Sequence, residues 1–170
     1  MRMGLLDKAM EAAQKLTHEH PESAVGPTLA GVIHVWRNAP DQARAAFQKA
    51  RALDPDEPSV GFNLATLDFH EGNLEAAHQV LLETLQRNPR NPRVLQRLGE
   101  LEAVMERPEA KARISEWMAL EPQNVQPKVL LAQLHLQAGE PQKALDLTQR
   151  LLQSDPENIQ LGGVVGQAYL

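Results

Sequence analysis

Five prolines recur along the chain at a nearly constant interval, and this period constrains the fold more than any other feature. Pro21, Pro55, Pro89, Pro122 and Pro156 are separated by 34, 34, 33 and 34 residues. An alanine stands twelve residues before each proline, and a Gly or Ala recurs in the first half of each unit. A fixed period of this length indicates a repeat architecture in which each unit contacts only its neighbours.

Two apolar-periodic segments lie between successive prolines. In segments 58–71 and 74–88, leucines recur at i, i+3 and i+4, which is the spacing of a helix. Gly72 predicts a turn between the two segments, and Pro89 ends the second one, because the residue before a proline avoids the α region. Each unit is therefore predicted to be a helix-turn-helix that buries its apolar face only by stacking. The predicted fold class is an all-α solenoid.

The repeat resembles the tetratricopeptide repeat (TPR). The resemblance rests on the period, on the A-x3-F spacing from Ala43 to Phe47, and on Val165-Gly166-x2-Tyr169, which stands where that family has L-G-x2-Y. The early Trp of the family is missing from every unit. The resemblance implies a right-handed superhelix and a non-enzymatic protein-protein interaction scaffold.

The repeat divides the chain into one array that starts and stops in mid-repeat. The expected units are a half repeat at 4–23, full repeats at 24–57, 58–91, 92–124 and 125–158, and a half repeat at 159–170. We expect such a chain to be a fragment of a longer repeat protein. Helix breaks are expected near Asn38-Pro40, Gly72, Glu106-Pro108 and Gly139. The third full repeat is one residue short, which predicts a tightened turn near Glu106-Pro108.

A narrower resemblance rests on the amino-acid sequences of three segments, NLATLDFHEGNLEAA, LEPQNVQPKVLLAQLHLQAGEPQKAL and VVGQAYL. They are similar to the TPR-repeat lipoproteins of bacterial PEP-CTERM (exosortase) exopolysaccharide systems. This resemblance implies an envelope scaffold for polysaccharide export or protein sorting, in the periplasm or on the outer membrane. Without it, a cytoplasmic location is expected.

Composition excludes several classes of function. The net charge of −5 argues against a general nucleic-acid binder, which normally has a basic surface. The apolar runs are too short for a membrane span. The chain has no Cys, so thiolate metal sites and cysteine nucleophiles are excluded. Phosphate-loop, dinucleotide, zinc-protease and nucleophile-elbow motifs are all missing. We therefore expect no catalysis, no metal and no cofactor.

The TPR resemblance implies that the first helix of each repeat lines a concave groove, where a partner segment binds. The inward stripe then consists of Val25, Thr28, Val32, Val35, Trp36, Ser59, Phe62, Asn63, Thr66, Phe69, Arg93, Gln96, Arg97, Glu100, Gln126, Val129, Gln133 and Leu136. This groove begins apolar and becomes polar and basic. We expect a protein or peptide partner, and we do not expect a carboxylate clamp for chaperone C-termini, because the Lys and Asn residues of such a clamp are missing.

An arginine cluster interrupts the acidic composition. Arg87, Arg90, Arg93 and Arg97 lie within eleven residues. In one interpretation, Arg87 interacts with the dipole at the C-terminal end of its helix and the other arginines are solvent-exposed. In the other interpretation, the arginines bind an anion such as a peptide carboxylate or an acidic sugar. The second interpretation supports an alternative function, a polysaccharide-binding module.

One polar residue recurs late in each first helix: His34, Asp68, Glu102, His135 and Tyr169. These positions form either a shared metal or proton site, or a set of packed residues whose polar tips bond to a neighbouring backbone or turn group. The second is favoured, because equivalent places in adjacent repeats lie about 10 Å apart, too far for shared metal ligands.

The two terminal half repeats are complementary. A second helix at 5–19 and a first helix at 159–169 together make one whole repeat, which predicts weak head-to-tail self-association. A two-fold dimer that pairs like ends is the alternative, because exposed apolar ends are not selective.

Overall fold

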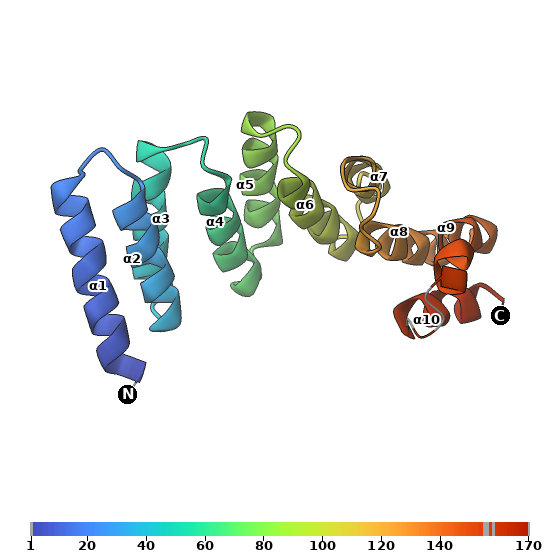
Figure 1. Ribbon diagram of the computed structural model, residues 1–170. Coiled ribbons are helices and arrows are strands. Elements are labelled where there is room, and N and C mark those ends of the chain that lie inside the picture. The colour runs from blue at the N-terminus through green and yellow to red at the C-terminus, as the bar shows by residue number, and fades with distance from the viewer. Residues whose placement is uncertain (1, 155–156, 158, 170) are drawn as a thin grey trace. The chain divides into compact units, whose positions relative to one another are not determined.

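The computed structural model describes residues 2–154, 157 and 159–169, and it divides into two compact units, 1–89 and 90–170. The described residues form ten α-helices and no strand, which confirms the all-α class (Figure 1). The right-handed superhelix and the repeat limits stay predictions.

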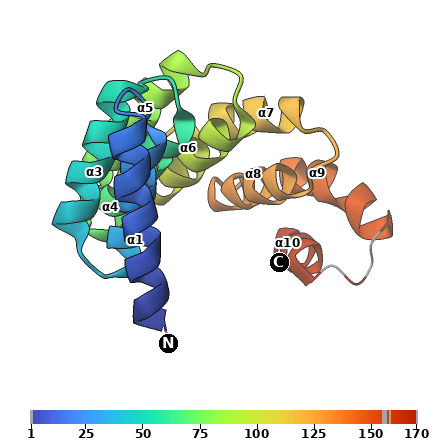
Figure 2. The ribbon, with the colours of Figure 1, turned by 60° about the vertical axis from the view of Figure 1, so that its left-hand side comes forward.

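Each unit is a row of packed helices. Unit 1 contains α1 (Arg2–Glu19), α2 (Val25–Trp36), α3 (Pro40–Leu53), α4 (Pro58–His70) and α5 (Leu74–Arg87). Unit 2 contains α6 (Pro92–Val104), α7 (Ala110–Leu120), α8 (Gln126–Gln137), α9 (Pro141–Ser154) and α10 (Ile159–Ala168). The pairs α2–α3, α4–α5, α6–α7 and α8–α9 pack closely, and each pair is one helix-turn-helix (Figure 2).

The core of unit 1 is centred on Phe47 of α3, whose side chain is fully buried. Its cluster includes Ala43 of α3 and Val60 and Leu64 of α4, so α3 joins its own helix pair to the next one. Gly31 of α2 lies directly against the ring, and a Cβ atom at this position would come within 2.4 Å of it. The recurrent small residue therefore allows the close helix contact that the sequence predicts.

The core of unit 2 follows the same pattern. Leu98 of α6 and Ile114 of α7 are fully buried. A second cluster contains Val129, Ala144 and Leu161, and thus joins α8, α9 and α10. The pair α8–α9 thus completes its core with the next helix, as expected for stacked repeats.

The four turns within the helix pairs share one hydrogen-bonding pattern. Asn38, Gly72, Glu106 and Gly139 all have a positive φ, between 54° and 79°. The amide N–H of the following residue donates to the carbonyl oxygen five residues before it, for example from Asn73 to Asp68 at 2.8 Å. This is the Schellman pattern that satisfies the last carbonyls of a helix. The predicted helix breaks are confirmed at all four places.

The short third repeat is accommodated by a tightened turn, as predicted. The backbone N–H of Ala110 donates to the carbonyl oxygen of Arg107, three residues back, at 3.2 Å, whereas the equivalent alanines bond four residues back. The other second helices begin two residues after the positive-φ residue, whereas α7 begins at Ala110, four residues after Glu106. As a result α7 has 11 residues, and α3, α5 and α9 have 14 each. The reason is packing: Ala110 is as buried as Ala43 and Ala144. Because Ala110 reaches the core one residue early, residues 107–110 form a tighter turn in place of the first α-helical turn.

Ion pairs connect successive repeats near the ends of the first helices. Arg44 of α3 contacts Asp68 of α4 at 2.8 Å and Glu71 at 2.9 Å. The buried Asp68 therefore pairs with a side chain of the preceding repeat, and not with a backbone or turn group. In unit 2 the equivalent Lys111 of α7 contacts Glu140 at 2.9 Å. These ion pairs therefore connect neighbouring helix pairs within each unit.

Glu140 is the centre of the cluster in unit 2. Its carboxylate accepts hydrogen bonds from Lys143 at 2.8 Å and Lys111 at 2.9 Å, and it lies 2.6 Å from Nδ1 of His135. These hydrogen bonds hold the pKa of Glu140 well below its usual range, and the bond to Lys143 has the largest effect, followed by those to His135 and Lys111. One carboxylate thus joins α7, α8 and α9.

This cluster predicts a pH-dependent contribution to stability. A carboxyl group with a lowered pKa stabilises the folded state above its unfolded pKa of about 4.3, and this stabilisation is lost as the pH falls toward the folded pKa. We therefore expect Glu140→Gln to lower the free energy of unfolding at pH 7, and the difference from wild type to shrink below about pH 4. Urea titrations at pH 7, 5 and 3 measure this difference. Glu109→Gln is the control, because Glu109 is exposed and makes no side-chain cap bond. A difference that stays constant down to pH 3 would contradict the prediction.

Candidate partner-binding surfaces

Unit 2 has a hollow of about 170 Å³ on the side formed by its first helices. Its lining comes from α6, α8 and α10, together with one residue of α7. The lining residues are Glu100, Trp117, Gln126, Val129, Leu130, Gln133 and Gln160. The structure thus brings four predicted groove residues to one place: Glu100, Gln126, Val129 and Gln133.

The chemistry of this hollow is an apolar floor with a polar rim. Trp117 and Val129 are buried below it, and the rim carries one carboxylate and three amide side chains. Gln96 donates a hydrogen bond to Oε1 of Glu100 at 2.9 Å, which orients that carboxylate. Amide side chains can donate to and accept from a peptide backbone at the same time. The rim therefore suits an extended chain segment.

The floor of the hollow is held by a second set of hydrogen bonds. The indole N–H of Trp117 donates to Oε2 of Glu121 at 2.8 Å, and the amide of Asn124 donates to the same oxygen at 2.9 Å. The bonds from Asn124 and then Trp117 lower the pKa of Glu121. Asn124 also accepts from the backbone N–H of Gln126 at 2.9 Å, so the turn before α8 is tied to the end of α7.

Unit 1 presents an uncharged face on its first helices. Trp36 is 60% exposed and Phe69 is 44% exposed, and Val25 and Val35 are exposed too. The remaining predicted positions on this face are partly or fully accessible: Thr28, Val32, Ser59, Phe62, Asn63 and Thr66. The sequence of α2 contains no charged residue. This face suits apolar anchors of a partner.

Some predicted groove residues contribute mainly to the core. Val129 is only 5% exposed and belongs to the core cluster of unit 2, against which Leu136 also packs. Val32 packs against the core of unit 1 in the same way. The periodic stripe includes them because a helix placed between two neighbours has a wide apolar face, and spacing alone does not separate its inner part from its exposed edge.

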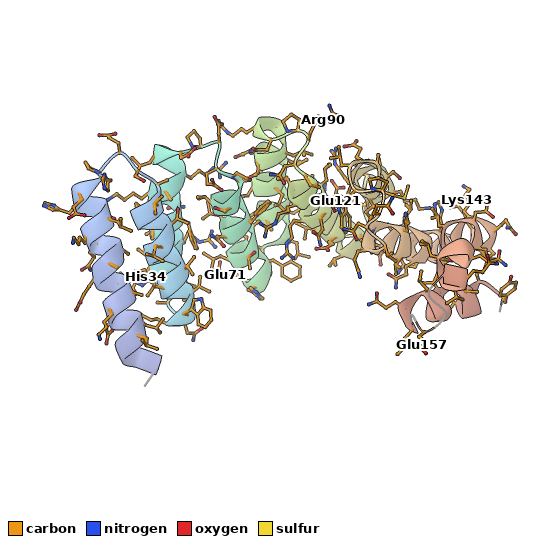
Figure 3. All side chains as sticks on the ribbon, viewed as in Figure 1. His34, Glu71, Arg90, Glu121, Lys143 and Glu157 are labelled. Atoms are coloured by element: carbon orange, nitrogen blue, oxygen red, sulfur yellow. The ribbon has the colours of Figure 1, made fainter. Side chains whose placement is uncertain are left out.

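The arginine cluster is divided between the two units. Arg87 ends α5 in unit 1 and contacts Asp56 at 3.3 Å. Arg90 extends from the connection after α5 (Figure 3), and Arg93 and Arg97 are exposed on α6 in unit 2. Arg97 contacts Glu100 at 3.5 Å. Anion binding by these residues stays a prediction.

Three lining residues of the hollow were missed by sequence reasoning. Gln160 stands 34 residues after Gln126, so extending the inward stripe into the last half repeat would have found it. Leu130 follows Val129 on α8. Trp117 lies on the second helix of its repeat. Its position under the hollow results from tertiary packing and cannot be predicted from the neighbouring residues in the sequence.

The described residues include no group of three His, Asp or Glu side chains placed to hold a metal ion. Among the same residues, no helix combines the length and the apolar character that crossing a bilayer requires.

A family model described as tetratricopeptide repeat matches residues 37–105 and 106–168. The chain therefore belongs to the tetratricopeptide repeat family. This family's repeats build scaffolds for protein-protein interaction, and the fold described above is that of such a scaffold.

Several solved structures match the fold of this chain at low sequence identity. The structure is similar to MamA, with a TM-score of 0.76 and 17% identity over 92% of both chains. It is similar to YrrB, described as a TPR protein with an unusual peptide-binding site, with a TM-score of 0.79 and 18% identity over 95% of this chain and 84% of that one. For PilF of Pseudomonas aeruginosa the TM-score is 0.73, with 21% identity over 96% and 82% of the chains. At these identities the likeness concerns the fold alone.

Proposed function

We propose that this chain is a non-enzymatic scaffold that binds an extended segment of a partner protein on its first-helix faces. The observation that carries the proposal is the hollow in unit 2, where one carboxylate and three amide side chains surround an apolar floor. A peptide offers what this rim needs, namely backbone N–H and C=O groups along its length and side chains that can enter the hollow. YrrB, a protein of similar fold, is described as having a peptide-binding site, which supports the proposal.

The two units select different parts of a partner. The uncharged face of unit 1, with Trp36 and Phe69 exposed, suits aliphatic or aromatic side chains. The rim in unit 2 suits polar groups. A segment held by a carboxylate clamp would need several basic side chains instead, and the first-helix face of unit 1 has none at the predicted positions.

A peptide selection tests this function. A random 12-residue library displayed on phage is selected against the whole chain, and the affinity of the best peptides is measured by calorimetry. We expect Gln133→Trp, which fills the hollow, to weaken them at least tenfold without lowering the melting temperature. Gln149→Ala is the control, because Gln149 is equally exposed but lies on the second helix α9. Peptides that bind the Gln133→Trp variant as tightly as wild type would contradict the proposal.

An acidic polysaccharide is the alternative ligand, favoured by the exposure of Arg90, Arg93 and Arg97 in unit 2. In this case the selection yields no peptide, and polygalacturonate oligosaccharides bind the wild type but not an Arg93→Ala/Arg97→Ala variant. The contact between Arg97 and Glu100 makes this the weaker proposal, because it neutralises part of the positive charge.

The proposed setting is a bacterial envelope system for exopolysaccharide export or protein sorting, with a periplasmic or outer-membrane location. It is supported by the resemblance of three sequence stretches to PEP-CTERM lipoproteins. Head-to-tail self-association is likewise a proposal. It is supported by the exposure of Leu5 on α1 and of Ile159 and Tyr169 near α10.

A further inference from the structure

The hollow on the first-helix side of unit 2 has the size of a single side chain. Its volume is about 170 Å³, which is below the roughly 300 Å³ at which sites for small molecules begin. A cavity of about 150 Å³ holds one benzene molecule. A partner segment that lies along the first helices therefore places one side chain in the hollow, and the chemistry of the lining selects which one.

The charge of the lining is negative. Of the described residues that line the hollow, Glu100 alone is charged. Glu121 adds a second carboxylate next to the floor, because it accepts a hydrogen bond from the indole N–H of Trp117 at 2.8 Å. Complementary charges favour the correct partner at an interface, and like charges disfavour a wrong one. The hollow therefore disfavours an acidic side chain and favours a lysine or an arginine.

The arrangement of polar and apolar groups suits a long amphipathic side chain. Trp117 and Val129 are buried below the hollow, whereas the carboxylate and the three amide groups surround it. A lysine side chain packs its four methylene groups along an apolar surface while its ammonium group stays at the polar edge. A purely aliphatic side chain would cover the floor and leave the carboxylate without its cation.

The rim also distinguishes lysine from arginine. Its acceptors stand on three helices, with Glu100 on α6, two glutamines on α8 and one on α10. An ammonium group donates three hydrogen bonds in different directions, so it suits acceptors that stand apart. A guanidinium group binds best to both oxygens of one carboxylate. In Glu100 both oxygens already have a contact, Oε1 with Gln96 at 2.9 Å and Oε2 with Arg97 at 3.5 Å.

We propose that this hollow is a specificity pocket for one lysine side chain of the partner segment, an inference that rests on the proposed function. The methylene groups of the lysine cover Val129 and the floor, and its ammonium group binds Glu100 and the amide oxygens of the rim. The pocket thus selects a basic residue at one position of a segment whose apolar residues contact the uncharged face of unit 1.

Arg97 competes with the lysine for Glu100. Its side chain is 62% exposed, and the two residues are three positions apart on α6. Exposed ion pairs of this kind contribute little to stability, so an incoming ammonium group displaces Arg97 at a low cost. Removing Arg97 should therefore strengthen the binding of a lysine peptide. An acidic polysaccharide requires the opposite result, because it would bind through Arg97.

The experiment starts from the tightest of the phage-selected peptides and uses the whole chain. Each lysine of the peptide is replaced in turn by norleucine, which keeps four carbons of the side chain and removes the ammonium group. We expect one position at which norleucine weakens binding about tenfold in calorimetry, the usual effect of losing a hydrogen bond to a charged group. Arginine at the same position should weaken binding about threefold, because its planar group does not suit separate acceptors.

Variants of the protein assign this effect to Glu100. In Glu100→Gln, which keeps the shape of the side chain, the norleucine peptide should bind within about twofold of the lysine peptide. Glu109→Gln is the control, because it removes the same charge from an exposed position directly before α7, away from the hollow. Here the tenfold difference should remain. Arg97→Ala should tighten the binding of the lysine peptide about twofold. The peptide substitutions themselves use the wild-type chain, so the main comparison does not depend on the folding of any variant.

The lysine pocket is overturned if the selected peptides contain no lysine, or if norleucine or arginine binds as tightly as lysine. It is also overturned if the norleucine effect persists in Glu100→Gln. In each of these cases peptides still bind, so the proposed function stands without the pocket. If the selection yields no peptide at all, the proposed function and the pocket are both wrong.

Discussion

Phe47→Ala is expected to lower the free energy of unfolding by about 3–5 kcal/mol, the usual cost of removing a fully buried ring. Phe47 is 0% exposed and belongs to a core cluster that includes residues of α3 and α4. Gly31 lies against the ring with no side chain of its own, so this position cannot fill the cavity. Since small domains are stable by only about 5–15 kcal/mol, this single change removes a large part of the total.

The matched control is Phe69→Ala, because Phe69 is 44% exposed at the end of α4. It should cost less than about 1 kcal/mol. Urea unfolding followed by circular dichroism measures both variants. Equal losses for the two phenylalanines would show that Phe47 is not the centre of the core.

Trp117→Ala is expected to cost about 3–5 kcal/mol for a similar reason. Trp117 is 2% exposed, and the change also removes the hydrogen bond from its indole N–H to Glu121. Because Trp117 lies under the hollow in unit 2, the variant should also lose affinity for any peptide that enters this hollow.

Trp36→Ala is the control, because it removes the same side chain from a position that is 60% exposed. Its stability should stay within about 1 kcal/mol of wild type. The two tryptophans, the only ones in the chain, also report on different units by fluorescence. A loss caused by Trp36→Ala as large as that caused by Trp117→Ala would contradict the assigned burial.

The repeat was readable from the sequence because its landmarks are local. A proline breaks a helix beyond its first turn, and a position that permits a positive φ marks a turn without help from the rest of the chain. The helix breaks near Asn38, Gly72, Glu106 and Gly139 were predicted on this basis, and the structure confirms them. Even Glu106, which is neither Gly nor Asn, follows the register of the repeat.

The candidate sites were only partly predictable. The stripe on the first helices includes Glu100, Gln126 and Gln133, which line the hollow of unit 2. It also includes Val129, which is buried. A period of 3.6 residues identifies the face of a helix on which a residue lies, but not how far its side chain is buried. Trp117 was missed, because it reaches the hollow from a second helix.

The amino-acid sequence alone was sufficient for the all-α repeat, its family and the positions of its turns, since each depends on residues close together in the chain. The consequences of the missing residue after Glu106 depended on tertiary packing. Ala110 keeps its buried place, so the turn before it closes over three residues instead of four, and α7 begins later than the other second helices. The partners of Asp68 and Glu140 were decided in the same way, because ion pairs between repeats form only after the helices have stacked.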